Sequence, residues 1–316
     1  MPNKLLVVIG GPTGVGKTEM AIRLALHYKT SILSADSRQV YSELSIGVGK
    51  PTAAQLEMVP HYLIGHTTIS EHYSAGDYTR DALVILDRLF KAHAIVLMTG
   101  GTGLYIKAIM EGFDEIPDVP DEINDHWTKI WKEQGTEALT EALKNVDPDY
   151  LSSVDVANPM RLIRALSVCE ATGKPYSSFR KGEKTVRPFN VLPIVLDLPR
   201  EVLYHRIDQR VLQLIEQGWI EEAKSLLPHR NLKALQTVGY NELFSFLDGD
   251  ITLDTAISSI QQSTRRYAKR QLTWWRHQGE WHSFSPEDVS SIINIIDKEL
   301  EARGREQGAR SKEQRG

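Results

Sequence analysis

Short apolar runs alternate with amphipathic stretches along most of the chain. Four runs predict buried strands, over residues 5–9, 31–35, 94–98 and 190–198, and a last short strand is expected near 281–284. Between them, apolar residues recur with a helical period, as over 74–91 and 252–278, whereas 46–60 has the composition of a loop. Strands that alternate with helices favour an α/β fold with a parallel sheet flanked by helices.

The stretch between the third and fourth of these strands differs from the rest, because no strand pattern interrupts its three or four predicted helices. We therefore expect an α/β core of residues 1–113 and 188–300, with a helical C-terminal part, and a helical insertion domain of residues 114–187. From residue 301 the chain has almost no apolar residue. The charged tail 301–316 is therefore expected to be disordered.

Composition limits the classes of protein to consider. The 316 residues are 41% hydrophobic and 25% charged, which is ordinary for a globular protein of one large domain or two. The single cysteine, Cys169, excludes an internal disulfide framework, and its apolar neighbours predict a buried helix position. No apolar run approaches roughly 18 residues and no secretory leader is visible. We expect no membrane span, a cytoplasmic location and a monomer.

The first strand leads into a glycine-rich loop that ends in a lysine and a threonine. This loop matches G-x-x-x-x-G-K-[ST] and consists of Gly11, Pro12, Thr13, Gly14, Val15, Gly16, Lys17 and Thr18. Backbone N–H groups of such a loop surround a phosphate at a helix N-terminus, where the dipole favours negative charge. Lys17 supplies a point charge, and the Thr18 hydroxyl can hold Mg²⁺. The loop predicts a diphosphate or triphosphate ligand and leaves the reaction open.

Two further strand ends carry candidate site residues. Asp36 follows the second strand, and ligands of open α/β sheets gather at the carboxyl ends of strands, so Asp36 is expected near the phosphate loop. A helix cap or turn would also explain it. The third strand ends in the turn Gly100–Gly103, which is either a second anion-binding turn or simply a tight one. It carries no acid for magnesium, which disfavours a plain P-loop ATPase.

Two pairs of arginines lie on predicted helices. Arg161 and Arg164 share a face of an insertion helix. Arg206 and Arg210, on the helix after the fourth strand, would either clamp a phosphate or form a solvated basic face.

A basic segment lies in the longest predicted helix. Between Arg265 and Arg276 it holds five cations, interleaved aromatic residues and no acid, although the formal net charge of the chain is −4. Ala268, Leu272 and Trp275 fall on one face and are expected in the core. The flanks suit contact with an RNA backbone and base stacking, or they form an ordinary charged surface.

Together these stretches resemble the tRNA dimethylallyltransferase (tRNA isopentenyltransferase) family. The matching segments occur in the family's order over residues 5 to about 284; they are 11–18, 34–41, 100–105, 161–166, 238–240 and 269–274. Each segment alone is weak evidence, whereas the combination is specific. No Cys/His zinc finger follows the core, which resembles the bacterial type.

The resemblance implies a reaction and its partners. A dimethylallyl group would pass from dimethylallyl diphosphate to the N6 amine of the adenosine on the 3′ side of the anticodon. The tRNAs would be of the UNN-reading type, diphosphate would be released, and Mg²⁺ would be the cofactor. The P-loop NTPase-like loop would then hold a leaving diphosphate instead of ATP, which agrees with the missing strand-end acid.

The family's motifs also imply roles for single residues. Asp36 would take the proton of the amine, with Thr13 close by, while Lys17, Arg210 and Mg²⁺ at Thr18 would stabilise the departing diphosphate. The insertion would contact the anticodon stem-loop, whose target base leaves its stack. The implied tRNA contacts are Asp36, Ser37, Arg38, Gln39, Thr102, Asn124, Arg161, Arg164, Lys269, Arg270, Trp274 and Arg276.

Four places depart from the family pattern: Met160, Ser167, Asn124 and Val48-Gly49. They concern the grip on tRNA and touch neither the loop nor Asp36. Three other functions stay open: a small-molecule kinase, which the loop alone permits, a prenyltransferase of free AMP, and a non-catalytic RNA-binding NTPase. A free nucleotide would need neither the basic helix nor the insertion.

Overall fold

The chain forms two compact units. The computed structural model describes residues 4–114, 116–182 and 184–313. The first unit consists of the chain up to Met110 and from Arg187 onward, and the second of Glu111–Val186. The expected borders, after residues 113 and 187, lie close to this division.

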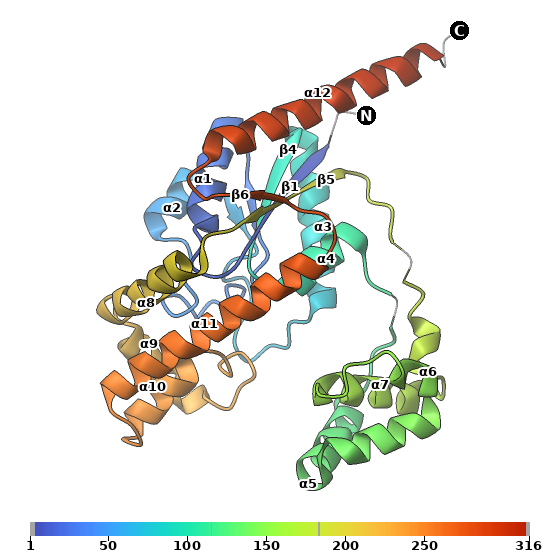
Figure 1. The fold of residues 1–316 in the computed structure, drawn as a ribbon, viewed down its shortest axis with the longest axis vertical. Helices are drawn as coiled ribbons and strands as arrows, with labels where there is room; N and C mark the ends of the chain where they lie inside the picture. Colours follow the sequence, from blue (N-terminus) through green and yellow to red (C-terminus); the bar gives the residue numbers. More distant parts are fainter. Residues whose placement is uncertain (1–3, 115, 183, 314–316) are drawn as a thin grey trace. The chain divides into compact units, whose positions relative to one another are not determined.

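A six-stranded parallel sheet organises the first unit, in the order β3-β2-β4-β1-β5-β6 (Figure 1). Its strands are β1 Leu5–Gly10, β2 Ile32–Ser34, β3 His61–Tyr62, β4 Ile95–Thr99, β5 Asn190–Leu196 and β6 His282–Phe284. The chain winds to one side of β1 and later crosses to the other, which places the end of β1 at a topological switch point. Helix α2 (Ala53–Met58) lies inside the stretch 46–60 that the pattern predicts as a loop, and β3 follows directly after it.

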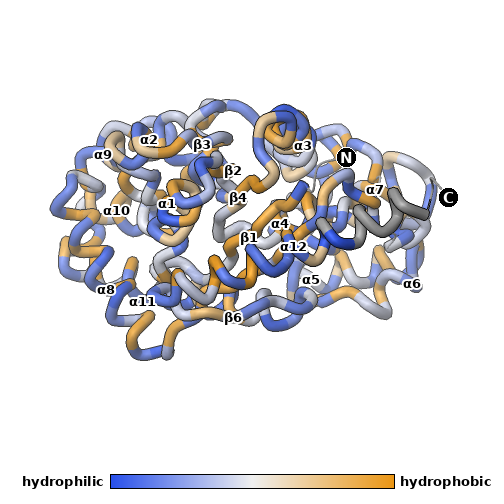
Figure 2. Tube along the Cα trace, turned by 90° about the horizontal axis from the view of Figure 1, so that it is seen from above, coloured by the Kyte–Doolittle hydropathy of each residue, from blue (hydrophilic) through white to orange (hydrophobic). Residues whose placement is uncertain are grey.

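Helices cover both faces of the sheet. They are α1 Lys17–Tyr28, α3 Ala75–Ala92, α4 Gly103–Glu111, α8 Arg200–Glu216, α9 Trp219–Leu226, α10 Tyr240–Leu247, α11 Leu253–His277 and α12 Val289–Glu313. Side chains of β1 alternate between the two faces: Leu6 and Val8 pack with α3, α4 and α9–α11, and Leu5 and Val7 pack with α1, α8 and α12. Figure 2 shows β1 as a hydrophobic segment among helices of alternating hydropathy.

Helix α11 runs past the carboxyl ends of the strands (Figure 1). Trp275 lies so close to Gly10 that a Cβ there would come within 2.7 Å of the indole ring, and Trp274 lies equally close to Gly103. Ala268 and Trp275 are buried and Leu272 packs beside them, as predicted. This contact brings a distant part of the chain to the phosphate loop.

The C-terminal tail differs from the sequence-based prediction. Residues 301–316 were expected to be disordered, but α12 continues to Glu313. Charged residues that are good helix formers explain this, because Arg303 pairs with Glu299 and Arg305 with Glu301 one turn away. Residues 314–316 lie outside the described residues.

The second unit is helical, as expected. It contains α5 Asp121–Val146, broken at Gly135 (φ 82°), α6 Pro148–Leu151, α7 Pro159–Thr172 and the 3₁₀ turn Tyr176–Phe179. Cys169 on α7 is buried, as predicted, and burial raises the pKa of its thiol. Within the part of the chain that the structure describes, no helix is long and apolar enough to cross a membrane.

Candidate active site

The phosphate loop connects β1 to α1 and is shaped by glycine. Gly11, Gly14 and Gly16 have φ of 141°, 81° and 106°, and a Cβ on Gly11 would lie 2.7 Å from the Leu196 carbonyl oxygen. The Lys17 Nζ donates to the carbonyl oxygens of Gly11 and Pro12 at 3.0 and 2.8 Å. Burial lowers the pKa of Lys17 to about 8, while the Asp36 carboxylate raises it and Arg210 lowers it further.

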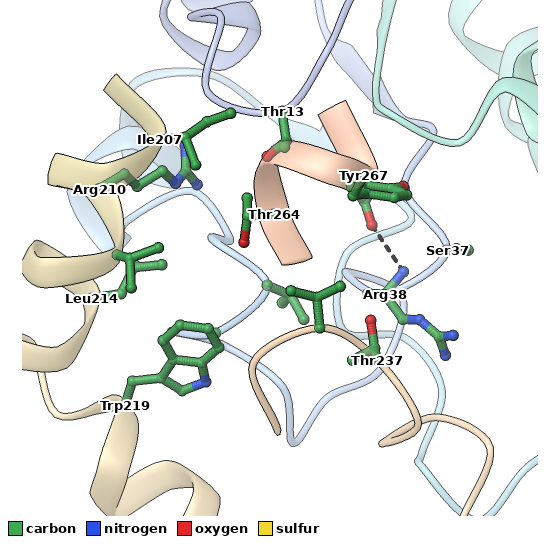
Figure 3. Close-up of a pocket in the computed structure, with 15 residues that line it drawn as sticks. Thr13, Ser37, Arg38, Ile207, Arg210, Leu214, Trp219, Thr237, Thr264 and Tyr267 are labelled. Carbon is green, nitrogen blue, oxygen red and sulfur yellow. Dashed lines mark hydrogen bonds between the residues drawn. The ribbon is translucent and has the colours of Figure 1, made fainter. Parts of the chain in front are cut away.

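Asp36 lies beside this loop, as predicted. It follows β2, and its Oδ1 accepts hydrogen bonds from the backbone N–H groups of Arg38 (2.9 Å, Figure 3) and Gln39 (3.3 Å). The turn interpretation of Asp36 is therefore correct as well, since these bonds form an Asx turn. They fix the carboxylate at a point where it acts on the charges of both Lys17 and Arg210.

The Gly100–Gly103 turn fastens the Asp36 segment. The Thr102 N–H donates to the Ala35 carbonyl at 3.1 Å, and the Thr102 Oγ1 accepts from the Ser37 N–H at 2.9 Å. A Cβ on Gly100 would lie 2.1 Å from the Ala35 oxygen. The structure agrees with the interpretation of Gly100–Gly103 as a tight turn, because the N–H and the hydroxyl of Thr102 hydrogen-bond to residues 35–37.

Gln271 is a site residue that the sequence analysis missed. Its Oε1 accepts from the Thr13 N–H at 2.8 Å, and its Nε2 donates to the Gly101 carbonyl at 2.9 Å. The side chain is buried. A polar residue in the middle of the otherwise apolar buried face of α11 was the available signal, because a buried amide needs partners.

A cavity of about 290 Å³ opens between the loop, Asp36 and α8. One side is polar, and it is lined by Thr13, Asp36, Ser37, Arg38, Thr237, Thr264 and Tyr267 (Figure 3). Ile207, Leu214 and Trp219 lie across from Ser37, Arg38 and Tyr267 in Figure 3, and the other apolar residues of the lining are Val48, Val211 and Val238. The site can therefore hold a molecule with an anionic group, an apolar portion and a proton donor facing Asp36.

Arg206 and Arg210 do not form the phosphate clamp that their spacing allowed. Arg206 donates to Glu287 at 2.8 Å, whereas Arg210 lines the cavity. Enclosure by protein lowers the pKa of the Arg210 guanidinium and Asp36 raises it. Gly49 lets this guanidinium approach, since a Cβ there would lie 1.9 Å from its nitrogen. One arginine of the pair thus serves the site.

The loop next to Arg210 is held by two side chains. The Gln39 Nε2 donates to the Gly49 carbonyl at 3.1 Å, and its Oε1 accepts from the Ser34 hydroxyl at 3.1 Å. The Glu222 carboxylate, which the sequence analysis missed, accepts four hydrogen bonds. Its donors are the N–H groups of Ser45 (3.0 Å), Ile46 (2.7 Å) and Gly47 (2.9 Å) and the hydroxyl of Tyr240 (2.6 Å).

The residues of the basic segment on α11 separate onto different sides. Arg270 lies 5.7 Å from the ring centre of Tyr267 on the cavity side. Lys269 and Arg276 line a second hollow, with Arg200. Arg265 forms an ion pair with Asp208. The cations of this segment therefore have different neighbours.

The remaining predicted tRNA contacts lie in the second unit. Asn124 is on α5, Arg161 is exposed on α7, and Arg164 donates to the Pro117 carbonyl at 3.4 Å.

Thr18, the predicted magnesium ligand, is in the first turn of α1. The described residues contain no group of three or more His, Cys, Asp or Glu side chains that could hold a metal. The Thr18 hydroxyl would be the loop's contribution to a magnesium ion bound with a diphosphate, since Mg²⁺ needs few protein ligands.

A phosphate loop, a carboxylate at the next strand end and a half-apolar cavity define a P-loop-type α/β transferase, which confirms the predicted fold class. The chain belongs to the IPP transferase family, whose model matches residues 39–278. Among curated relatives, tRNA dimethylallyltransferase 1 of Bacteroides thetaiotaomicron is 46% identical over 291 residues, covering 92% of this chain and 94% of that protein. The tRNA dimethylallyltransferase of Cytophaga hutchinsonii is 43% identical, covering 95% and 98%.

Solved structures agree with this assignment. The tRNA isopentenylpyrophosphate transferase from Bacillus halodurans aligns with a TM-score of 0.72 at 33% identity, over 97% of this chain and 100% of that one. A eukaryotic dimethylallyltransferase acting on tRNA aligns with a TM-score of 0.75 at 25% identity, over 91% and 75%.

Replacing Gln271 should loosen the phosphate loop. Gln271→Leu leaves the Thr13 N–H and the Gly101 carbonyl without their partner, so we expect a loss of about 1–3 kcal/mol in unfolding free energy and weaker binding of inorganic diphosphate. Urea unfolding and calorimetry measure the two effects. Gln262→Leu, at an exposed position of the same helix, is the matched control and should change neither. Equal stability of the two variants would contradict this role.

Proposed function

We propose that the chain transfers the dimethylallyl group of dimethylallyl diphosphate to the N6 amine of the adenosine 3′ of the anticodon in tRNA. Diphosphate is the other product. The observation that carries the proposal is the position of Asp36, beside both Lys17 and the half-apolar cavity. A carboxylate there can take a proton from an amine in the cavity while the loop holds the leaving group.

The donor is bound by charge at one end and by apolar contact at the other. The N–H groups of the loop, the Lys17 ammonium and Arg210 neutralise the diphosphate as the C–O bond breaks. Ile207, Val211 and Leu214 give the five-carbon chain an apolar wall. Bound Mg²⁺, held by the Thr18 hydroxyl, would supply further positive charge to the diphosphate oxygens.

The acceptor enters from the polar side. The C–N bond forms as the C–O bond breaks, and the Asp36 carboxylate takes the proton that the N6 amine loses. An adenine must leave its stack to reach this carboxylate, and Tyr267 offers it a ring on the cavity wall. The Arg38 side chain, which also lines the cavity, is held in place because its Nη1 donates to the carbonyls of Lys233 and Ala234 at 3.1 and 3.2 Å. The hydrogen bond from the Ser37 N–H to the Thr102 hydroxyl keeps the segment that carries Asp36 and Arg38 in place.

Gripping the tRNA is assigned to residues outside the cavity. We assign Arg270 and Trp274 to the anticodon loop, and Lys269 and Arg276 to its phosphates. In the second unit, Asn124, Arg161 and Arg164 serve the stem-loop. A monomer that works in the cytoplasm, where tRNA is modified, remains our expectation.

A kinase using ATP is the second candidate. The phosphate loop alone favours it, but β4 ends at Thr99 with no acid to hold a nucleotide-bound magnesium ion.

The direct test offers both donors to the same protein. With dimethylallyl diphosphate, ATP, Mg²⁺ and unmodified tRNA, we expect prenylated adenosine in digested nucleosides, measured by mass spectrometry, and no phosphorylated product. An anticodon stem-loop should replace whole tRNA, whereas free AMP should not react. Phosphate transfer from ATP without prenylation would favour the kinase instead.

Asp36→Asn separates proton transfer from binding. The amide oxygen can still accept from Arg38 and Gln39, so the turn is kept, but the base is lost. We expect kcat to fall by roughly 10²- to 10⁴-fold while inorganic diphosphate still binds, because the loop N–H groups and Arg210 that would hold it are kept. Rapid-quench kinetics and calorimetry provide the two readouts. A variant with full kcat would remove Asp36 as the base.

The Lys17 ammonium should limit activity at high pH. Its pKa is lowered to about 8 in the free protein, so the charge that attracts the diphosphate is present below that pH and is lost above it. We expect kcat/KM for the donor to fall as pH rises through about 8, measured from roughly pH 6.5 to 9.5, whereas kcat should fall at higher pH because bound diphosphate stabilises the ammonium. Lys17→Arg, which stays charged, should lose the fall near pH 8; a fall that persists there would assign it to another group.

A further inference from the structure

The cavity ends at an indole ring. Trp219, the first residue of α9, is 2% exposed and lines the cavity. Figure 3 shows it at the far end from Thr13, with Ile207, Arg210 and Leu214 along the side between them. An apolar chain that starts at the phosphate loop and follows this side therefore points at the indole.

The side between them is suited to a chain. Ile207, Val211 and Leu214 are four and three residues apart on α8, so they share one face of the helix, which is directed into the cavity. Arg210 belongs to the same stretch of α8 and meets the diphosphate, so charge and apolar wall follow one another along one element.

The indole has no room to move aside. A Cβ on Gly47 would lie 2.0 Å from its Nε1, and a Cβ on Gly239 (φ 97°) would lie 2.0 Å from its Cζ2. Tyr240 packs against the ring edge-on, with centroids 5.9 Å apart. The backbone at Gly47 is itself held by Glu222, which accepts from three successive N–H groups.

We propose that Trp219 sets the length of the prenyl chain that the donor can carry. The inference rests on the proposed function, because it takes the apolar wall as the seat of that chain. On this proposal a five-carbon chain ends before the indole. A ten-carbon chain has to displace a ring that glycine backbones hold from two sides, and such overpacking is disfavoured.

The test compares two donors in one protein. Wild type should use dimethylallyl diphosphate at least roughly 100-fold better than geranyl diphosphate, measured as kcat/KM with the same tRNA. Trp219→Leu should raise the ratio of geranyl to dimethylallyl kcat/KM by about 10-fold or more, since it removes the ring and leaves an apolar residue. A residue that only stabilised the fold would lower both values together and leave the ratio unchanged.

Two further variants keep the test decisive if Trp219→Leu folds poorly. Leu214→Ala widens the same end of the cavity from α8 and should shift the ratio in the same direction. Leu212→Ala, on the exposed side of α8, is the matched control and should not shift it.

The outcomes distinguish the two proposals. A wild type that accepts geranyl diphosphate as well as dimethylallyl diphosphate would overturn the role of Trp219. The role would also be overturned if Trp219→Leu and Leu214→Ala left the ratio of geranyl to dimethylallyl kcat/KM unchanged and raised the KM for tRNA. That result would place the adenine at the Trp219 end of the cavity. Absence of any transfer from dimethylallyl diphosphate in the wild type would count against the proposed function itself.

Discussion

The approach of α11 to the ends of β1 and β4 is the contact on which the site depends. The buried amide of Gln271 links the phosphate loop at Thr13 to the turn at Gly101, and two tryptophans beside it require Gly10 and Gly103. The turn at Gly101 in turn positions Ser37 through Thr102, next to Asp36. Three segments that are far apart in the chain are therefore held in one arrangement, and the cavity is the space they leave.

The charges in this space oppose one another in a useful way. Arg210 is close enough to Lys17 to disfavour the charged form of the lysine, and Asp36 partly compensates. An incoming diphosphate relieves that repulsion, because it brings negative charge to both cations. The carboxylate then faces an uncharged amine. In the proposed reaction the same three side chains would favour an anionic donor before the transfer and a proton transfer during it.

Most of the fold was predictable from the sequence because its strands and helices follow local patterns of apolar and polar residues. The buried strands are continuous apolar runs, and the loop before Lys17 is a sequence motif whose glycines adopt positive φ.

The site was predictable where residues follow strand ends, as Asp36 does. Gln271 and Glu222 were not, since their roles lie in partners 258 and 177 residues away, respectively, and no local pattern indicates which amides a buried side chain will meet. The prediction of a disordered tail beyond residue 301 was wrong for a different reason. The low hydrophobicity of these residues indicated disorder, whereas their helix propensity allows α12 to continue to Glu313.

The phosphate loop itself does not decide between transferring a phosphate and releasing one. Its N–H groups and Lys17 stabilise negative charge on the group they hold, whether that group is attacked or departs. What changes the reaction is the surroundings. An acid at the end of β4 would favour a nucleotide with magnesium, whereas Thr99 stands there and the opposite wall is a row of aliphatic side chains that ends at Trp219. In the proposed reaction Asp36 faces that wall, the bond that breaks joins an apolar carbon to a diphosphate oxygen, and the loop holds the leaving group.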